Sequence, residues 1–195
     1  MHRTNAERSE ATRAHLVATA TRLYAEHGYA GVGTEEIVRQ AGLTRGALYH
    51  HFADKRELFR AVHEAVEEDV VDRIVAGVAG VADTWELMVA GMRTYLDLCT
   101  DPMVRQITLI DGPSVLGWKE WREIDGRHGL GLVANALEAA MDAGVLRRRP
   151  VEPLAHLLLA AMAEAGLMVG TAADPAEERE AVEGPLMALL EGLRA

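Results

Sequence analysis

The sequence predicts an all-α protein with two parts, an N-terminal three-helix unit followed by an antiparallel helical bundle. Three observations carry this prediction. No segment alternates apolar and polar residues over five positions with β-branched content. Apolar residues instead recur every three or four positions along most of the chain, and clusters of Gly, Pro and Asp separate the resulting blocks. With 195 residues, 49% of them hydrophobic, the chain is large enough to bury a substantial core.

The first predicted helix covers residues 10–27, where Leu16, Ala20 and Leu23 form one apolar stripe. Gly28 follows directly and suits a left-handed C-cap. Thr34 is expected to cap a second helix, since threonine is a favoured N-cap residue. Glu35 and another acidic side chain follow it, and negative charges in a first turn interact favourably with the positive end of the helix dipole.

A turn at Gly42 precedes a third helix over Arg45–His51, capped by Thr44. A long fourth helix then begins at Ala53-Asp54 and extends to about residue 78. Its apolar residues recur every fourth position: Leu58, Val62, Val66, Val70, Ile74 and Val78. Further helical blocks are expected at about 84–100, 103–110, 118–143, 152–171 and 176–194, with breaks at Pro102, 111–113, Gly144, 147–150 and 174–175.

Charge and cysteine content narrow the possible classes of protein. The single cysteine, Cys99, excludes an intramolecular disulfide and a Cys-based zinc site, and is expected to be a small core residue. The first 60 residues carry a net charge of +2, whereas residues 61–195 carry −12. A basic head on an acidic body is compatible with nucleic-acid binding, because phosphate contacts need a local patch. The first residues contain no apolar stretch, so we expect no signal peptide and a cytoplasmic protein.

Residues 34–51 are predicted to form helix, glycine turn and helix, with a second helix that is short and poor in acids. Its exposed side would carry Thr44, Arg45, Gly46, Tyr49 and His50, while Leu48 and Phe52 face inward. Donors at a helix N-terminus suit phosphate, arginine can pair with guanine, and a glycine permits close approach to DNA. This pattern is typical of a recognition helix, although a plain helical hairpin with a basic face would look similar.

Residues 15–60 resemble the N-terminal domain of the tetracycline-repressor family of bacterial transcriptional regulators. The matching segments are LYAEHGY (23–29), GTEEI (33–37) and AGLTRGALYHHFADKREL (41–58). The resemblance implies that Thr34, Tyr49 and Lys55 contact phosphate, that Thr44 and Arg45 read bases and phosphate, and that His50 contacts either. Gly46 belongs to the same predicted DNA-binding set.

On this resemblance we interpret the chain as a ligand-responsive DNA-binding transcriptional regulator, a repressor in preference to an activator. It would bind an inverted-repeat operator as a homodimer, be released by a small, mostly apolar inducer, and associate with the nucleoid when bound to DNA. Residues 1–57 would form the DNA-binding domain and residues 58–195 the ligand-binding and dimerisation domain. No enzyme activity, cofactor or metal is expected. The alternative is a helical-bundle enzyme or ligand carrier with a helix-turn-helix-like hairpin and no role on DNA.

Residues that could line an inducer pocket fall on three predicted helices. Methionine and aromatic side chains make adaptable pocket walls. The candidates are Met88, Met92, Tyr95, Trp118, Trp121, His128 and Met162. The alternative is that these side chains are ordinary core residues.

Residues 153–173 are apolar on nearly all sides, which would suit a membrane span by length alone. His156 and Glu164 within the segment favour a helix buried between its own bundle and a partner subunit. The resemblance implies that the last two helices form the dimer interface, and Leu158, Met162, Leu186 and Leu190 are its predicted residues.

Two further patterns are weak. Residues 129–134 match GxGxxA but lack a preceding strand, so a dinucleotide site is not expected. Asp125 and His128 could form a metal pair on one helix, but a di-iron bundle needs a second such element.

Overall fold

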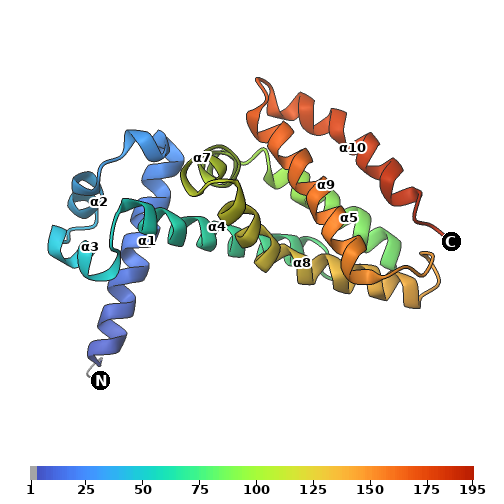
Figure 1. Cartoon of the computed structure of the whole chain (residues 1–195), viewed down its shortest axis with the longest axis horizontal. Coiled ribbons are helices and arrows are strands. Elements are labelled where there is room, and N and C mark those ends of the chain that lie inside the picture. The colour runs from blue at the N-terminus through green and yellow to red at the C-terminus, as the bar shows by residue number, and fades with distance from the viewer. Residues whose placement is uncertain (1–3) are drawn as a thin grey trace.

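The computed structural model describes residues 4–195, and these residues form an elongated all-α molecule (Figure 1). The head contains α1 (Asn5–Gly31), α2 (Thr34–Gln40) and α3 (Arg45–His51), and α4 (Lys55–Gly77) extends from it into the body. Leu146 and Arg194 form an isolated β-bridge, and residues 4–195 contain no β-strand. The predicted all-α class is confirmed. The body consists of α5 (Thr84–Leu98), α6 (Pro102–Val104), the π-helix η1 (Arg105–Asp111), α7 (Gly112–Leu116), α8 (Trp118–Asp142), α9 (Val151–Thr171) and α10 (Pro175–Glu191).

Helix α1 begins earlier than its apolar stripe suggests, because Thr4 and Glu7 form a capping box at its start. Gly28 interrupts the helix with φ +69° and ψ 164°, so the expected break occurs there, and a short further turn follows to Gly31. Only glycine adopts this backbone conformation at low cost.

The caps of the next helices agree with the sequence at Thr44 but not at Thr34. The Thr44 hydroxyl accepts a hydrogen bond from the Ala47 N–H at 3.2 Å, and the Asp54 carboxylate accepts one from the Glu57 N–H at 2.8 Å. Gly33 is the N-cap of α2, and Thr34 is its first helical residue. The prediction that Thr34 caps this helix is therefore wrong, and its hydroxyl is available for another partner.

The predicted break at residues 111–113 is also wrong, because helical structure continues from Pro102 to Leu116 through η1 and α7. Pro113 lies in the first turn of α7, directly after the π-helix, and does not end the helical run. Gly112 packs against His63, and a Cβ at this position would lie 2.8 Å from the His63 Nε2 atom. The break comes later, at Gly117, where φ is +81°.

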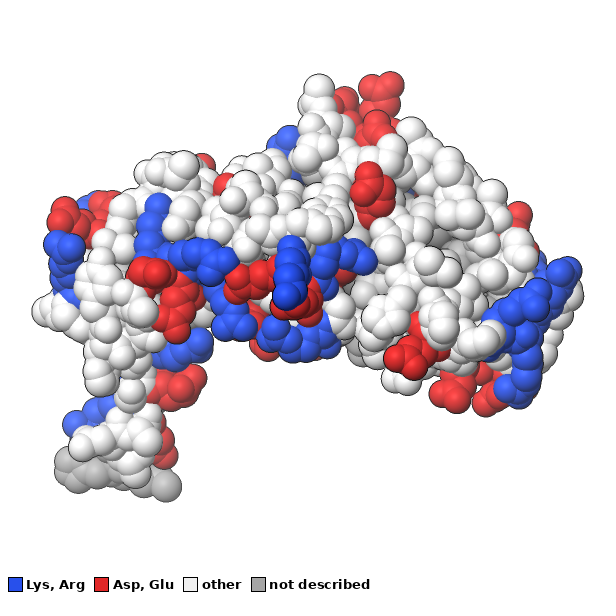
Figure 2. Space-filling view, in the orientation of Figure 1, with Lys and Arg blue, Asp and Glu red and all other residues white. Residues whose placement is uncertain are grey.

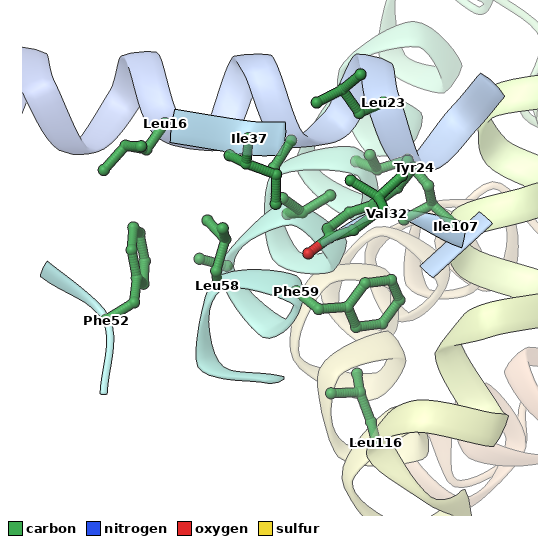
Figure 3. Packing of buried hydrophobic residues seen from close by; sticks show 14 of the residues in the cluster. Leu16, Leu23, Tyr24, Val32, Ile37, Phe52, Leu58, Phe59, Ile107 and Leu116 are labelled. Carbon is green, nitrogen blue, oxygen red and sulfur yellow. The ribbon is translucent and has the colours of Figure 1, made fainter. Parts of the chain in front are cut away.

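The head and the adjoining part of the body share one hydrophobic core. Figure 3 shows Phe59 of α4 between Tyr24 of α1 and Leu116 of α7. The Tyr24 and Phe59 ring centroids are 5.6 Å apart in an edge-on arrangement. This core extends past residue 57 to Ile107 and Ile124, so the domain boundary at residue 57 stays a prediction.

A second core lies between α5, α8, α9 and α10. Helix α9 passes through this bundle and packs against both α8 and α10. By length and composition α9 could cross a membrane, but 39% of its most apolar window is already buried within the chain.

Candidate functional site

The outer face of α3 carries the side chains that the sequence assigned to DNA. Thr44, Arg45, Gly46, Tyr49 and His50 are all exposed. Two residues on the opposite side, Leu48 and Phe52, are buried in the head core, so the predicted facing of this helix is confirmed.

Thr34, Arg45 and Tyr49 form a polar cluster across α2 and α3. Hydrogen bonds from the Thr34 and Arg45 side chains lower the pKa of Tyr49 below its usual value. The Arg45 guanidinium carbon lies 5.5 Å from the Tyr49 ring centroid, and Glu35 lies 3.7 Å from the same guanidinium. Tyr49 nevertheless remains 41% exposed. The cluster therefore presents a hydroxyl and a guanidinium, two groups that can donate hydrogen bonds to phosphate.

Gly46 has no structural reason to be glycine within this chain. A Cβ there would meet a single atom, Thr44 Oγ1, at an ordinary contact distance of 3.8 Å. The position is exposed, so a small residue here leaves open space on the outer face of α3.

Lys55 faces the end of α1 instead of open solvent. Its ammonium group donates a hydrogen bond to the Tyr29 carbonyl at 2.5 Å and lies 3.9 Å from the centroid of the Tyr29 ring. Partial burial lowers the pKa of Lys55, and the nearby charge of Asp111 opposes this shift. A phosphate contact by Lys55 stays a prediction, and in this structure the residue connects α4 to α1.

Basic and acidic side chains alternate over the junction between head and body (Figure 2). Glu120 of α8 accepts from Arg56 at 2.5 Å and from Arg60 at 2.9 Å, both on α4. Arg127 of α8 pairs with Glu64 of α4 at 2.8 Å. Exposed pairs of this kind contribute little stability individually, but together they fix how α8 crosses α4.

A cavity of about 150 Å³ lies in the body between α4, α5, α8, α9 and α10. Four of the predicted pocket residues line it: Met88, Met92, Tyr95 and Met162. Glu67, Tyr95 and Asp125 are the lining residues with polar side chains, and the remainder of the wall is apolar. A cavity of this size accommodates one aromatic ring.

Three other predicted pocket residues, Trp118, Trp121 and His128, do not line this cavity, and their role in an inducer site stays a prediction. Trp118 is 58% exposed, and its ring lies 5.0 Å from the ring of Trp121. Trp121 is buried and donates a hydrogen bond to the Thr108 carbonyl at 2.8 Å. His128 lies on α8 outside the cavity wall, and its buried Nε2 atom has no hydrogen-bond partner among the described residues.

The residues predicted for the dimer interface face the inside of a single chain. Leu186 and Leu190 are buried in the second core, and together with Leu158 and Met162 they line the cavity. Their place in a dimer interface stays a prediction. The exposed large apolar residues of α9 and α10 are Leu157, Met168 and Leu189, and Leu189 also lines the cavity.

Two acidic residues that face the cavity were missed as site residues. The sequence pattern assigns no role to Glu67 and marks Asp125 only as half of a possible metal pair. Burial raises the pKa of Glu67 to about 8 and that of Asp125 to about 6, and the Arg122 guanidinium opposes the second shift. The available sequence signal was that Glu67 directly follows Val66 of the apolar stripe and precedes Val70 by three residues.

Residues 4–195 bring no three His, Cys, Asp or Glu side chains close enough to hold a metal ion. Cys99 is buried, and its burial raises the pKa of the thiol to about 12, so the expectation of a core cysteine is confirmed.

Comparisons with known proteins agree with this architecture. Residues 16–62 match the family model described as bacterial regulatory proteins of the tetR family, and residues 85–193 match that of the tetracyclin repressor-like C-terminal domain. The chain is 26% identical over 152 residues to the transposon Tn10 TetC protein of Escherichia coli, covering 78% of this chain and 77% of TetC.

Two solved structures are similar over nearly the whole length. A TetR-family transcriptional regulator from Pectobacterium atrosepticum is 33% identical, with a TM-score of 0.89 over 99% of this chain and 98% of that chain. RolR in complex with its ligand resorcinol is 20% identical, with a TM-score of 0.76 over 95% of this chain and 90% of RolR, and therefore supports the fold alone. The chain belongs to the TetR family and is a DNA-binding transcriptional regulator in a family of non-enzymes.

Proposed function

We propose that this regulator is a repressor that binds an inverted-repeat operator as a homodimer and leaves it when a small, mostly apolar molecule enters the body cavity. The observation that carries the proposal is that α4 joins the two sites. Its first residue, Lys55, contacts the end of α1, and further along it Glu67 and Val70 line the cavity.

The outer face of α3 supports the DNA-binding half of the proposal. Arg45 and Tyr49 would contact phosphate and base edges, with Thr34, Thr44 and His50 at the margins and Gly46 allowing close approach. Two such helices enter successive major grooves when they are roughly 34–36 Å apart, which requires a dimer.

The open faces of α9 and α10 support the dimer. Leu157 is 69% exposed and Leu189 is 56% exposed, and Met168 is a further exposed apolar residue on the same face of α9, where Glu164 is also exposed. On the preceding turns of α10, Ala181, Gly184 and Ala188 are small exposed residues, and a Cβ at Gly184 would meet nothing within 4 Å. An apolar surface of this kind is typical of an interface between subunits, and pairing would also cover the remaining open side of α9.

The cavity supports a small inducer. Its volume suits one aromatic ring, and three methionines provide walls that adapt to different shapes. RolR, whose fold is similar, has been solved with the single-ring molecule resorcinol. Release would follow from a shift between two dimer forms, because a ligand that binds one form better weakens DNA binding by that difference in affinity.

Regulators of this family are generally cytoplasmic. We propose the same location for this chain, with association with the nucleoid while it is bound to DNA and no insertion of α9 into a membrane.

The test is binding of the purified full-length protein to the DNA upstream of its own gene, compared with random duplex of the same length. We expect a clear preference, two protein chains per site and a steep loss of affinity with salt. Equal affinity for both duplexes would contradict the proposal and favour the alternative of a ligand carrier without a role on DNA.

A further inference from the structure

Glu67 is the one acidic side chain of the cavity that lacks a cationic partner of its own. Its side chain is only 14% exposed, and within residues 4–195 its ionic contact is with His63, whose Nε2 atom lies 3.8 Å from Oε1. Asp125, the other acid of the cavity wall, is paired with Arg122 at 3.1 Å.

His63 does not neutralise Glu67. The ring is fully buried between α4, Gly112 and Trp121, and this burial lowers the pKa of His63 to about 4. It is therefore neutral near pH 7, and neither ring nitrogen makes a hydrogen bond of normal geometry with a described residue.

Among the described residues, the other elements around Glu67 supply no unpaired positive charge to the cavity. On α4, Glu64 is occupied by Arg60 and Arg127. Helix α5 contributes the Tyr95 hydroxyl with Cys99 behind it, and α8 contributes the Asp125–Arg122 pair. The residues that α9 and α10 contribute to the cavity wall are all apolar.

We propose that this cavity takes a small organic cation with a single ring, whose protonated nitrogen binds the Glu67 carboxylate while the ring lies against Met88, Met92 and Met162. The proposal deepens the proposed function, since it assumes that the cavity is the inducer site. It commits to a cation and excludes the anionic class of ligand.

The chemistry of the wall favours a cation over other ligands of the same size. An anion would meet two carboxyl groups and no unpaired base. A neutral phenol could donate one hydrogen bond to Glu67, but a charge-assisted hydrogen bond in a water-poor site is stronger. The Tyr95 ring and the methionine sulfur atoms are electron-rich groups that stabilise a nearby cation further.

Binding of a cation would be coupled to release of a proton. Burial raises the pKa of Glu67 to about 8, so at pH 7 the carboxyl group is mostly protonated and must ionise to pair with a cation. Affinity for a permanently charged probe should therefore rise by up to about tenfold per pH unit between pH 6 and pH 8.

The experiment is isothermal titration calorimetry of the full-length protein with benzylamine, benzyl alcohol and benzoate as matched cationic, neutral and anionic probes. We expect benzylamine to bind most tightly and benzoate not at all. Titrations at pH 7 in buffers of different ionisation enthalpy should show that roughly one proton is released per benzylamine bound, because Glu67 must ionise to pair with the cation. Glu67→Gln should lower the affinity for benzylamine by about 10- to 100-fold while benzyl alcohol still binds. Glu68→Gln, at an exposed acid one residue further along α4, is the matched control and should bind as wild type does.

Three results would overturn the proposal: equal or tighter binding of benzyl alcohol, retention of the benzylamine preference in Glu67→Gln, or no binding of any probe. Operator binding by the ligand-free protein is measured in parallel. Retained operator binding with any of these three results rejects the cation and leaves the proposed repressor function standing. Loss of operator binding rejects that function whatever the calorimetry shows.

Discussion

Arg45 combines the exposure and the chemistry expected of a residue that distinguishes operator from other DNA. Its guanidinium lies over the Tyr49 ring, which orients it outward from α3. Arg45→Ala should weaken operator binding, reduce the preference for operator over random duplex, and lower the slope of log K against log salt by roughly 0.9 if one phosphate contact is lost. Arg148→Ala, which removes an exposed arginine paired with Asp142 in the body, should leave both quantities unchanged. Equal effects of the two substitutions would contradict the role of Arg45.

Lys55 is a less direct probe of DNA contacts than the resemblance implied. Its ammonium group is already bound to the Tyr29 carbonyl, so its removal also loosens the junction between α1 and α4. A loss of DNA affinity in a Lys55 variant would therefore have two possible physical causes, whereas Arg45 makes no such internal contact with α1.

Glu67 makes folding stability depend on pH in an unusual direction. An unfolded glutamic acid loses its proton near pH 4.5, whereas the folded group keeps it until about pH 8. The stability that this group contributes is present below pH 4.5 and is lost as pH rises to about 8. His63 has the opposite effect on stability, because burial lowers its pKa to about 4. Its effect on the free energy of unfolding changes with pH only below about pH 6.5, where the unfolded imidazole becomes protonated. Urea unfolding should therefore show stability falling by up to roughly 1.4 kcal/mol per pH unit between pH 6.5 and 8. Glu67→Gln should remove most of this slope, and an unchanged slope in that variant would be inconsistent with a buried, protonated Glu67.

Two glycines on neighbouring helices differ in what surrounds them. In α9 a Cβ at Gly166 would collide with the Tyr95 hydroxyl and lie 3.2 Å from Cys99 Sγ, so Tyr95 packs directly on the α9 backbone. In α8 a Cβ at Gly131 would meet nothing within 4 Å. Gly166→Ala should cost about 1–3 kcal/mol of stability by forcing Tyr95 to move, whereas Gly131→Ala should stabilise α8 by up to about 1 kcal/mol. Thermal unfolding of both variants checks the pair, and an unchanged or raised stability of Gly166→Ala would show that the packing at Gly166 is not tight.

The π-helix η1 connects the body to the end of α1 through one carboxylate. Asp111 accepts hydrogen bonds from the Tyr29 N–H at 2.7 Å and from Gln106 Nε2 at 3.1 Å, next to the positive-φ residue Gly28. Asp111→Ala leaves the part-buried Tyr29 N–H without this acceptor and should cost about 1–3 kcal/mol in urea unfolding. Asp111→Asn keeps one acceptor oxygen and should cost less. Equal losses for the two variants would mean that the charge of Asp111, and not its hydrogen bond to Tyr29, holds the junction.

The assembled molecule should be a dimer through the open faces of α9 and α10. Leu157→Glu and Leu189→Glu each place a charge in the proposed interface, which costs several kcal/mol when the charge is buried without a partner. Light scattering after size-exclusion chromatography should show dimers for wild type and a shift to monomers for both variants, with helical content retained. Val75→Glu, at an exposed apolar residue of α4, is the control and should remain dimeric. A monomeric wild type at micromolar concentration would contradict the dimer itself.

The all-α class, the positions of most helices, and the inward and outward faces of α3 follow from the amino-acid sequence alone. These features depend on contacts between residues three or four apart, on caps such as Thr44, and on glycine turns, all of which are local. The resemblance over residues 15–60 then identified the family, because the segment that forms α3 and begins α4 is specific.

Features that depend on how distant helices cover one another were decided only by the tertiary structure. Leu186 and Leu190 have the spacing of an interface, but α5, α8 and α9 of the same chain already enclose the cavity beside them. Trp118 has the composition of a pocket wall, yet it lies just beyond the positive-φ residue Gly117 and is exposed. Glu67 resembles its solvated neighbours along α4, and it became a site residue because α5 and α8 pack over that side of the helix. Periodicity along one helix gives the direction of each side chain, but which neighbour, cavity or solvent lies in that direction is a property of the packed molecule.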